Sequence, residues 1–406
     1  MNIVEVDYSD LSGKSFNGYE LHQALLRKGI TATQIVKWKE SSLDSVSAYA
    51  DDKVLDYQIR ELEDRYSIQN LLFPYADELE KMGEFQKADI VHYHLIHKGA
   101  FSLLDIPTLM NKKKSVWTIH DPWIVTGNCV HPLECKQWQD GCKECRRLDD
   151  GYFRMRENNA QFMWKVKKDI LGRINPVIVV ASDFMKRYVQ ESPITSHFQK
   201  IYKIPFGVEI SKYQLEKRDE YRRKFGILRH KFVIAYRSDE VELKGCRYLY
   251  DALRMIGRDE DIVLFCVGGG TVPEDIERKY HLINFGWLDD DRQIAEILGA
   301  SDLFIMPSLA ESFGLMAVEA MAAGCTVICF EKTVVAEVIN APYCGISVSY
   351  GAADEIAKEI KRLKMERESV QVRGQKGHEL VKYKYRFDEY VDRHICLYEK
   401  LMRGEI

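Results

Sequence analysis

The sequence of 406 residues lacks the features that mark several large classes of protein. It contains no apolar run of about eighteen residues or more, which excludes a transmembrane helix. Its first residues, MNIVEV, do not follow the pattern of a secretory signal peptide. The formal net charge is only −4, so no excess of positive charge favours nucleic-acid binding. We therefore expect a cytoplasmic protein without nucleic-acid partners, in which the ten cysteines are mostly reduced.

Two common nucleotide-binding motifs are also absent. No Gly-x-x-x-x-Gly-Lys-Ser/Thr phosphate loop occurs in the chain. Three glycines, Gly268 to Gly270, follow an apolar stretch, but their spacing does not match the dinucleotide motif Gly-x-Gly-x-x-Gly, and Pro273 and Glu274 come next. The sequence therefore does not support a nicotinamide cofactor. It shows no internal repeat and no low-complexity segment either.

Apolar stretches do alternate with helical patterns through most of the chain. We expect strands at residues 3–6, 90–94, 115–119, 176–181, 232–236, 262–267, 303–306 and 327–330. Such alternation predicts an α/β protein with parallel sheets covered by helices on both faces. A turn-rich segment, Ile204 to Glu209, separates two series of strands. We therefore expect an N-terminal domain at residues 1–206 and a C-terminal domain at 207–384, followed by a helix at 385–406 that packs back toward the first domain.

The most informative segment is Pro307 to Val327, which follows an apolar strand and contains a helical pattern ending at Gly324. Glu311 precedes the turn-prone Ser312-Phe313-Gly314, and Glu319 follows it. Ionised carboxylates accept hydrogen bonds from hydroxyl groups, while backbone N–H groups at a helix N-terminus favour an anion such as a phosphate. A nucleotide sugar carries both kinds of group. The alternative is that the two glutamates are ordinary solvated residues of a helix.

Two cations follow another expected strand. Arg237 comes directly after residues 232–236, and Lys244 precedes Gly245 and the next helical pattern. A diphosphate that leaves a sugar needs positive charge, and each lost donor of this kind costs about 3–4 kcal/mol of transition-state stabilisation. If they lie at the sheet edge beside Glu311, these cations would meet that need. The alternative is that both are solvated loop charges.

Further motifs join these residues into a series that runs through residues 205–345. The series is Arg237, Lys244-Gly245, Phe285-Gly286-Trp287, Pro307-Ser308, Glu311-Ser312-Phe313-Gly314 and Glu319-Ala320-Met321-Ala322-Ala323-Gly324. It resembles the donor-binding half of glycosyltransferase family 4, whose members are retaining, nucleotide-sugar-dependent enzymes. In the first half, His120-Asp121-Pro122-Trp123, Thr126-Gly127 and a group of cysteines resemble a bacterial branch that builds exopolysaccharide, capsule or colanic-acid-type glycans.

The resemblance implies the GT-B fold, in which two Rossmann-like domains have parallel sheets facing across a cleft. It implies transfer of a sugar, with retention, from a UDP- or GDP-sugar to a saccharide acceptor. The acceptor would be lipid-linked, and the enzyme would act at the inner face of the membrane without a catalytic metal or other cofactor. Two alternatives are a sugar-nucleotide epimerase of the same fold and a non-catalytic subunit that binds a nucleotide sugar.

The resemblance also implies roles for single residues. Arg237 and Lys244 would contact the donor diphosphate, and Glu311 would contact the donor sugar. His120 would lie near the transferred sugar and act with these three in catalysis. The remaining donor-binding residues would be Gly13 in the first loop, Trp287 and Leu288 near the base, Ser312, Phe313, Gly314 and Leu315 around the phosphates, and Glu319 on the ribose hydroxyls.

Four cysteines lie in an insertion at about residues 127–147: Cys129, Cys135, Cys142 and Cys145. The second pair has the Cys-x-x-Cys spacing of one half of a zinc knuckle, although the first pair is spaced more widely. Four thiolates suit a tetrahedral structural zinc, which would order the loop and take no part in chemistry. Thiols without a metal, or disulfides formed on air oxidation, are the alternatives.

Overall fold

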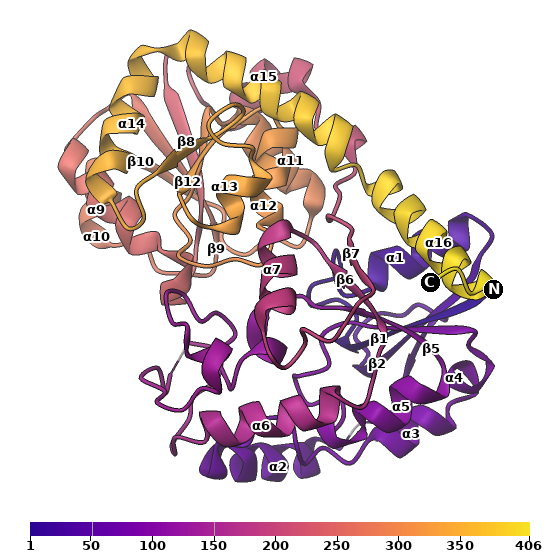
Figure 1. Cartoon of the computed structure of the whole chain (residues 1–406). Helices are drawn as coiled ribbons and strands as arrows, with labels where there is room; N and C mark the ends of the chain where they lie inside the picture. Colours follow the sequence, from indigo (N-terminus) through magenta and orange to yellow (C-terminus); the bar gives the residue numbers. More distant parts are fainter. Residues whose placement is uncertain (51, 150) are drawn as a thin grey trace. The chain divides into compact units, whose positions relative to one another are not determined.

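The computed structural model describes residues 1–50, 52–149 and 151–406 (Figure 1). The chain forms two compact units, one made of Met1–Ile204 with Val391–Ile406 and the other of Pro205–Tyr390. The division falls at Pro205, inside the turn-rich segment. Helix α16 (Phe387–Arg403) begins in the second unit, and from Val391 onward it belongs to the first.

The first unit is built around one seven-stranded, entirely parallel sheet in the order β3-β2-β1-β4-β5-β6-β7. Its strands are β1 (Asn2–Ser9), β2 (Thr31–Trp38), β3 (Val46–Ala48), β4 (Ile90–Tyr93), β5 (Lys114–Thr118), β6 (Val177–Val180) and β7 (Ile201–Lys203). Its α-helices are α1 (Tyr19–Arg27), α2 (Lys53–Tyr66), α3 (Ala76–Lys81), α4 (Gly83–Lys87), α5 (Ile106–Lys112), α6 (Ala160–Leu171), α7 (Asp183–Glu191) and the greater part of α16.

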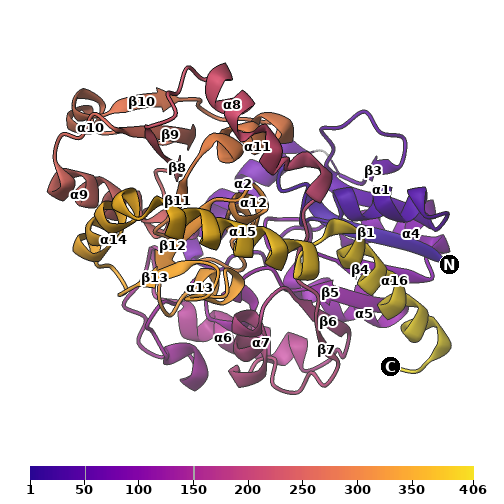
Figure 2. The same cartoon turned by 90° about the horizontal axis from the view of Figure 1, so that it is seen from above.

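The second unit repeats this plan with a six-stranded parallel sheet in the order β10-β9-β8-β11-β12-β13. Its strands are β8 (Phe232–Ser238), β9 (Ile262–Gly268), β10 (His281–Asn284), β11 (Leu303–Met306), β12 (Thr326–Phe330) and β13 (Ile346–Val348). Its α-helices are α8 (Arg218–Lys224), α9 (Cys246–Ile256), α10 (Glu274–Lys279), α11 (Asp291–Ala300), α12 (Leu315–Ala322), α13 (Val334–Val338), α14 (Ala353–Met365) and α15 (Arg367–Lys384). In Figure 2, α9 lies beside α14, α12 beside α15, and α8 beside α11. The predicted α/β class, with two Rossmann-like parallel-sheet domains, is confirmed.

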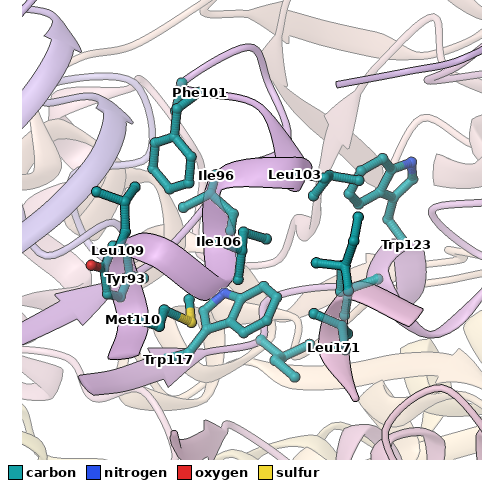
Figure 3. Close-up of a cluster of buried hydrophobic side chains, with 14 of the residues drawn as sticks. Tyr93, Ile96, Phe101, Leu103, Ile106, Leu109, Met110, Trp117, Trp123 and Leu171 are labelled. Atoms are coloured by element: carbon teal, nitrogen blue, oxygen red, sulfur yellow. The ribbon is translucent and has the colours of Figure 1, made fainter. Parts of the chain in front are cut away.

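The strands are apolar along most of their length because both faces of each sheet are covered. Every residue of β9 is buried, and so is every residue of β4. Figure 3 shows part of the core of the first unit, where Trp117 from β5 lies with Ile106 and Met110 from α5 and Leu171 from α6. Truncating one such side chain to alanine typically costs about 2–5 kcal/mol. Packing of this kind holds the strand ends in fixed positions.

Both sheets have a point at which the strand order reverses. In the first unit it lies between β1 and β4, and in the second between β8 and β11. Loops that leave the two strands at such a point run to opposite faces of the sheet and leave a crevice at the carboxyl ends, where ligands of open α/β sheets bind. Within the described residues, no helix combines the length and apolar character needed to cross a membrane.

Candidate functional site

The reversal point of the second sheet brings two loops into direct contact. Gly245, at the start of α9, has a φ of +69°, and a Cβ built on it would lie 1.9 Å from the carbonyl oxygen of Pro307. Farther along the same two loops, the backbone N–H of Leu309 donates to the carbonyl oxygen of Leu243 at 2.8 Å. Only glycine permits both this backbone conformation and this approach. The predicted Lys244-Gly245 motif thus brings the β8–α9 and β11–α12 loops together.

Lys244 and Glu311 form an ion pair across this contact. The Lys244 ammonium lies 2.8 Å from Oε1 of Glu311, and the Ser308 hydroxyl donates to the same oxygen at 3.1 Å. Both charged side chains are largely buried, with 22% and 14% of their surface exposed. The structure therefore joins two residues for which the resemblance implies separate contacts, one to phosphate and one to sugar.

Arg237 lies near the carboxyl end of β8, within reach of an exposed aromatic ring. Its guanidinium is 3.1 Å from a carboxylate oxygen of Asp239 and 5.3 Å from the centre of the Trp287 ring, in a cation–π contact. Nε of Arg237 is buried and makes no hydrogen bond within the described chain. An unsatisfied buried donor costs about 1–3 kcal/mol. The Nε–H group of Arg237 is therefore suited to donate a hydrogen bond to an oxygen atom of a ligand.

Trp287 itself is 65% exposed, and its ring N–H donates to Asp289 at 3.0 Å. Leu288, which follows it, is partly buried. The segment is anchored next to β9, because Gly268 donates its N–H to the carbonyl oxygen of Gly286 at 2.7 Å. A large aromatic face is thus held beside a cation at the sheet edge.

The three consecutive glycines after β9 have a packing role that the sequence left unassigned. A Cβ on Gly268 would lie 2.4 Å from the carbonyl oxygen of Ser238, and one on Gly270 would lie 2.5 Å from the backbone nitrogen of Asp239. Gly269 has open space around its Cβ position. The first and third glycines therefore let the segment after β9 pack against the end of β8, which carries Arg237, and against Asp239 directly after it.

Helix α12 starts at the same edge of the sheet. Gly314 precedes it with a φ of +88°, and its carbonyl oxygen accepts from the N–H of Ala317 at 2.9 Å. Backbone N–H groups of the first turn, beginning with Leu315, lie at the positive end of the helix dipole. Ser312 lies in the loop just before, and Glu319, one turn into the helix, is partly buried.

Phe313 has a different position from its neighbours. Its ring is 4% exposed and makes edge-to-face contacts with Phe206, at 5.3 Å between ring centres, and with Tyr385, at 5.8 Å. The side chain therefore belongs to the apolar core of the second unit. Any contact of Phe313 with a ligand would involve its backbone, as the resemblance implies.

Gly13 lies in a tight loop after β1 in the first unit. It has a φ of +80°, and its carbonyl oxygen accepts from the N–H groups of Phe16 at 2.9 Å and Asn17 at 3.0 Å. The Asn17 amide in turn donates to the carbonyl oxygens of Ser9 and Asp10 at 2.6 and 2.7 Å. This loop follows the first strand at the reversal point of its sheet.

His120 lies two residues after β5 and is partly buried. Its ring centre is 5.6 Å from that of Phe16 and 5.3 Å from that of His94, and its Nε2 is 3.1 Å from Nδ1 of His94. Burial, followed by the nearby His94, lowers the pKa of His120 well below its usual value. Through Phe16, the loop of Gly13 and the predicted His120 come together within one unit.

Behind His120 lies a buried group that the sequence did not reveal to us. A carboxylate oxygen of Glu5 is 2.7 Å from Nε2 of His94 and 3.0 Å from Nδ1 of His92. Burial alone would raise the pKa of Glu5, but His92 and His94 together hold it well below its usual range. A signal was present, since His92 on β4 and His94, directly after it, are two residues apart and so point to the same side of the sheet. Their partner on β1 depends on the strand register, in which Glu5 lies opposite His92.

The four cysteines of the insertion do not form a ligand set in this structure. Among residues 1–50, 52–149 and 151–406, the one group of three or more metal-ligating side chains with atoms close enough to share an ion is Glu5, His92 and His94. Cys142 accepts the N–H of Gly127 at 3.3 Å, and burial raises the pKa of its thiol to about 11. The structural zinc predicted at Cys129, Cys135, Cys142 and Cys145 therefore stays a prediction.

Comparisons with known proteins bear on this geometry. Residues 217–380 match the family model of glycosyl transferases group 1. Over 168 residues the chain is 23% identical to the putative colanic acid biosynthesis glycosyl transferase WcaC of Escherichia coli K12, which covers 37% of this chain and 40% of that protein. Over 138 residues it is 31% identical to the UDP-Gal:alpha-D-GlcNAc-diphosphoundecaprenol alpha-1,3-galactosyltransferase of Escherichia coli, covering 31% and 35%. The matched region thus spans less than half the length of either relative.

The similarity in three dimensions is more extensive. The crystal structure of Anabaena Alr3699/HepE in complex with UDP superposes with a TM-score of 0.68 at 15% sequence identity. The superposition covers 98% of this chain and 100% of the Anabaena chain. At this level of identity the likeness concerns the fold. It extends over both units of the chain, including the one outside the family model.

Proposed function

Because residues 217–380 form a glycosyl transferases group 1 domain in a chain with the GT-B fold, we propose that the protein is a glycosyltransferase. It moves a sugar from a nucleotide-diphosphate sugar to a saccharide acceptor in the synthesis of a cell-surface polysaccharide. The observation that best supports this proposal is the set of Arg237, Lys244 and Glu311 at the reversal point between β8 and β11. Cations and a carboxylate there suit a ligand with phosphates and hydroxyl groups.

The ion pair of Lys244 and Glu311 suggests how the donor binds. An incoming diphosphate competes with the Glu311 carboxylate for the Lys244 ammonium, since both bind the same cation. Lys244 then neutralises phosphate, and the released carboxylate accepts hydrogen bonds from hydroxyls of the donor sugar. The 2.8 Å contact is therefore a resting arrangement that the substrate exchanges for two contacts of its own.

Loss of the diphosphate leaves an oxocarbenium-like sugar, and the leaving charge needs stabilisation. Arg237, Lys244 and the N-terminus of α12 supply it, so the reaction proceeds without a divalent metal. The acceptor hydroxyl attacks from the face that the diphosphate leaves, which retains the anomeric configuration. His120 binds the transferred sugar in this scheme, and Glu319 accepts from the ribose hydroxyls.

The base lies against Trp287 and Leu288, because an exposed indole offers a stacking surface. A UDP-sugar is the first donor to test, since the structural neighbour from Anabaena was crystallised with UDP. The acceptor is a lipid-linked saccharide, supported by the similarity to the Escherichia coli galactosyltransferase that acts on a diphosphoundecaprenol-linked sugar. Such an acceptor places the reaction at the inner face of the membrane.

The proposal is tested by thermal unfolding of the full chain with UDP, GDP and ADP and their common sugar conjugates, each with and without EDTA. A ligand that binds only the folded state adds about 2.7 kcal/mol of stability at a hundredfold excess over its dissociation constant. We expect a shift with one nucleotide series that EDTA does not change. A shift that disappears in EDTA would overturn metal independence, and no shift with any nucleotide would overturn the donor site.

Product analysis then separates the remaining functions. We expect sugar transfer only when a saccharide acceptor is present. Release of an altered free sugar without an acceptor would identify an epimerase. Nucleotide-sugar binding without turnover under any acceptor would identify a binding subunit.

A further inference from the structure

His120 is the end of a chain of hydrogen bonds that begins at a fully buried carboxylate. We propose that Glu5 and His94 are positioning residues, which fix His120 with its proton on Nε2 so that its Nδ1 accepts a hydrogen bond from a hydroxyl group of the sugar substrate. This inference rests on the proposed function for the identity of the substrate. The tautomer that it assigns can be measured without any substrate.

The hydrogen bonds that link Glu5, His94 and His120 form a continuous series. Oε2 of Glu5 lies 2.7 Å from Nε2 of His94, and Nδ1 of His94 lies 3.1 Å from Nε2 of His120. The rings of His94 and His120 are stacked with their centres 5.3 Å apart and an interplanar angle of 30°. Glu5 and His94 are both buried, whereas His120 is partly exposed. The chain therefore runs from the interior of the first unit toward its surface.

The directions of the hydrogen bonds follow from the first one. An ionised carboxylate only accepts, so Nε2 of His94 carries the proton that it donates to Glu5. A neutral His94 then has a bare Nδ1, which accepts from Nε2–H of His120. Burial and the nearby His92 lower the pKa of His94 to about 4, and the pKa of His120 is lowered as well, so both rings are neutral at pH 7. A neutral His120 with a proton on Nε2 leaves Nδ1 as its acceptor.

The other oxygen of the Glu5 carboxylate also has a hydrogen-bond partner, which in turn contacts His92. Tyr398 of α16 donates to Oε1 of Glu5 at 3.1 Å, and its oxygen lies 2.7 Å from Nδ1 of His92. Nε2 of His92 lies 2.7 Å from the hydroxyl of Thr118. The network thus pairs both oxygens of Glu5 and both nitrogens of His92. All of these contacts are compatible with an ionised Glu5.

The backbone packs closely around the hydrogen bond between Glu5 and His94. Gly18, at the start of α1, has a φ of +88°, and a Cβ there would lie 2.8 Å from Nε2 of His94 and 2.9 Å from Cβ of Glu5. The first turn of α1 therefore closes over the bond between Glu5 and His94. Asp121 and His97, whose side chains lie 3.2 Å apart, are the other titratable groups that act on His120 besides His92 and His94.

A metal ion is the competing occupant of this cluster, because Glu5, His92 and His94 offer three ligand atoms. The distances of 2.7 and 3.0 Å between the carboxylate and the two rings are those of hydrogen bonds. A metal would also have to replace the protons on both rings. The hydrogen-bond pattern accounts for every one of these contacts without an ion.

The first test reads the tautomers directly. Full-length protein is labelled with ¹⁵N-histidine, and long-range ¹H–¹⁵N correlation spectra are recorded at pH 7, with His94→Gln and His120→Gln used for assignment. We expect His94 and His120 each to carry a proton on Nε2 alone, and both protons to exchange slowly with water. A proton on Nδ1 of either ring would overturn the inference. So would stoichiometric zinc that is retained by the wild type and lost from Glu5→Gln.

The second test separates positioning from packing. His94→Gln keeps a donor toward Glu5 and an acceptor toward His120, whereas His94→Phe fills the space better and has neither. We expect His94→Phe to lower kcat for sugar transfer by about tenfold or more, the scale of one lost hydrogen bond, and His94→Gln to recover a large part of it. The dissociation constant for the nucleoside diphosphate alone should change less than about twofold in both.

A control variant, His22→Gln, removes another buried imidazole of the same unit, which bonds to the Ser45 hydroxyl and the carbonyl oxygen of Gly18 but not to Glu5, His94 or His120. It should keep both the tautomers and the rate. Equal rates for the Phe and Gln variants of His94, alongside normal transfer by the wild type, would overturn the inference and leave the proposed function standing. A wild type that transfers no sugar would overturn the proposed function, while the spectra would still decide the tautomers.

Discussion

In the proposed reaction, single charged residues of the second unit stabilise the leaving diphosphate. We predict that Arg237→Ala and Lys244→Ala each lower kcat for transfer by about 10²–10³, the usual effect of removing one preorganised donor. Arg254→Ala is the matched control, because Arg254 is a partly exposed cation on α9 that pairs with Asp251 and Asp275. Steady-state transfer rates with one donor check this prediction. Near-normal rates for both site variants would contradict it.

One of these variants has a second expected outcome. Removal of Lys244 leaves the Glu311 carboxylate largely buried beside Ser308 without its cation. Loss of one partner from a buried pair is costlier than loss of both. We therefore predict that Lys244→Ala is less stable to urea than the double variant Lys244→Ala/Glu311→Ala. Equal unfolding midpoints would show that solvent already screens the pair.

The buried His94 predicts a particular dependence of stability on pH. Its pKa is lowered by burial to about 4 in the folded chain, against 6.5 for an ordinary histidine. The unfolded chain therefore binds a proton more readily between these values, and the stability that neutral His94 contributes is lost as the pH falls from 6.5 to 4. The slope is at most about 1.4 kcal/mol per pH unit for one proton. Urea unfolding at several pH values should give a slope in His94→Gln that is smaller than the wild-type slope by up to this amount.

At the scale of elements, the contact between the β8–α9 and β11–α12 loops depends on Gly245. We predict that Gly245→Ala lowers the free energy of unfolding by about 3 kcal/mol or more and weakens nucleotide binding, because the new Cβ meets the carbonyl of Pro307. Gly257→Ala tests the backbone strain alone, since Gly257 has a φ of +82° but open space, and Gly269→Ala tests neither. If Gly245→Ala behaves like Gly257→Ala, the close approach is unimportant.

The elements also show how far the sequence could lead. Strands such as β8 and β9 were predicted because strands covered on both faces are apolar throughout. The strands β2, β3, β7, β10 and β13 were missed, and β3, β7 and β13 have only three residues each, too few to carry a periodicity. The pairing of Lys244 with Glu311 was missed because it depends on two loops that meet only in the folded unit. The contact of Glu5 with Tyr398 joins residues 393 positions apart, and no local pattern predicts it.

At the scale of the whole molecule, the two units make separate contributions to the proposed reaction. Hydrogen–deuterium exchange can follow each of them, because amides ordered by a ligand exchange more slowly. With the nucleoside diphosphate alone, we predict slower exchange in the second unit, at the Lys244–Gly245 loop and the first turn of α12. With the intact nucleotide sugar, protection should extend to the first unit, at the loop of Gly13 and the segment that contains His120. Since His120 is proposed to bind the sugar and not the nucleotide, only the intact donor should produce this second change. Protection by the intact nucleotide sugar that stays confined to the second unit would remove the first unit from donor binding and restrict the donor site to residues Pro205–Tyr390.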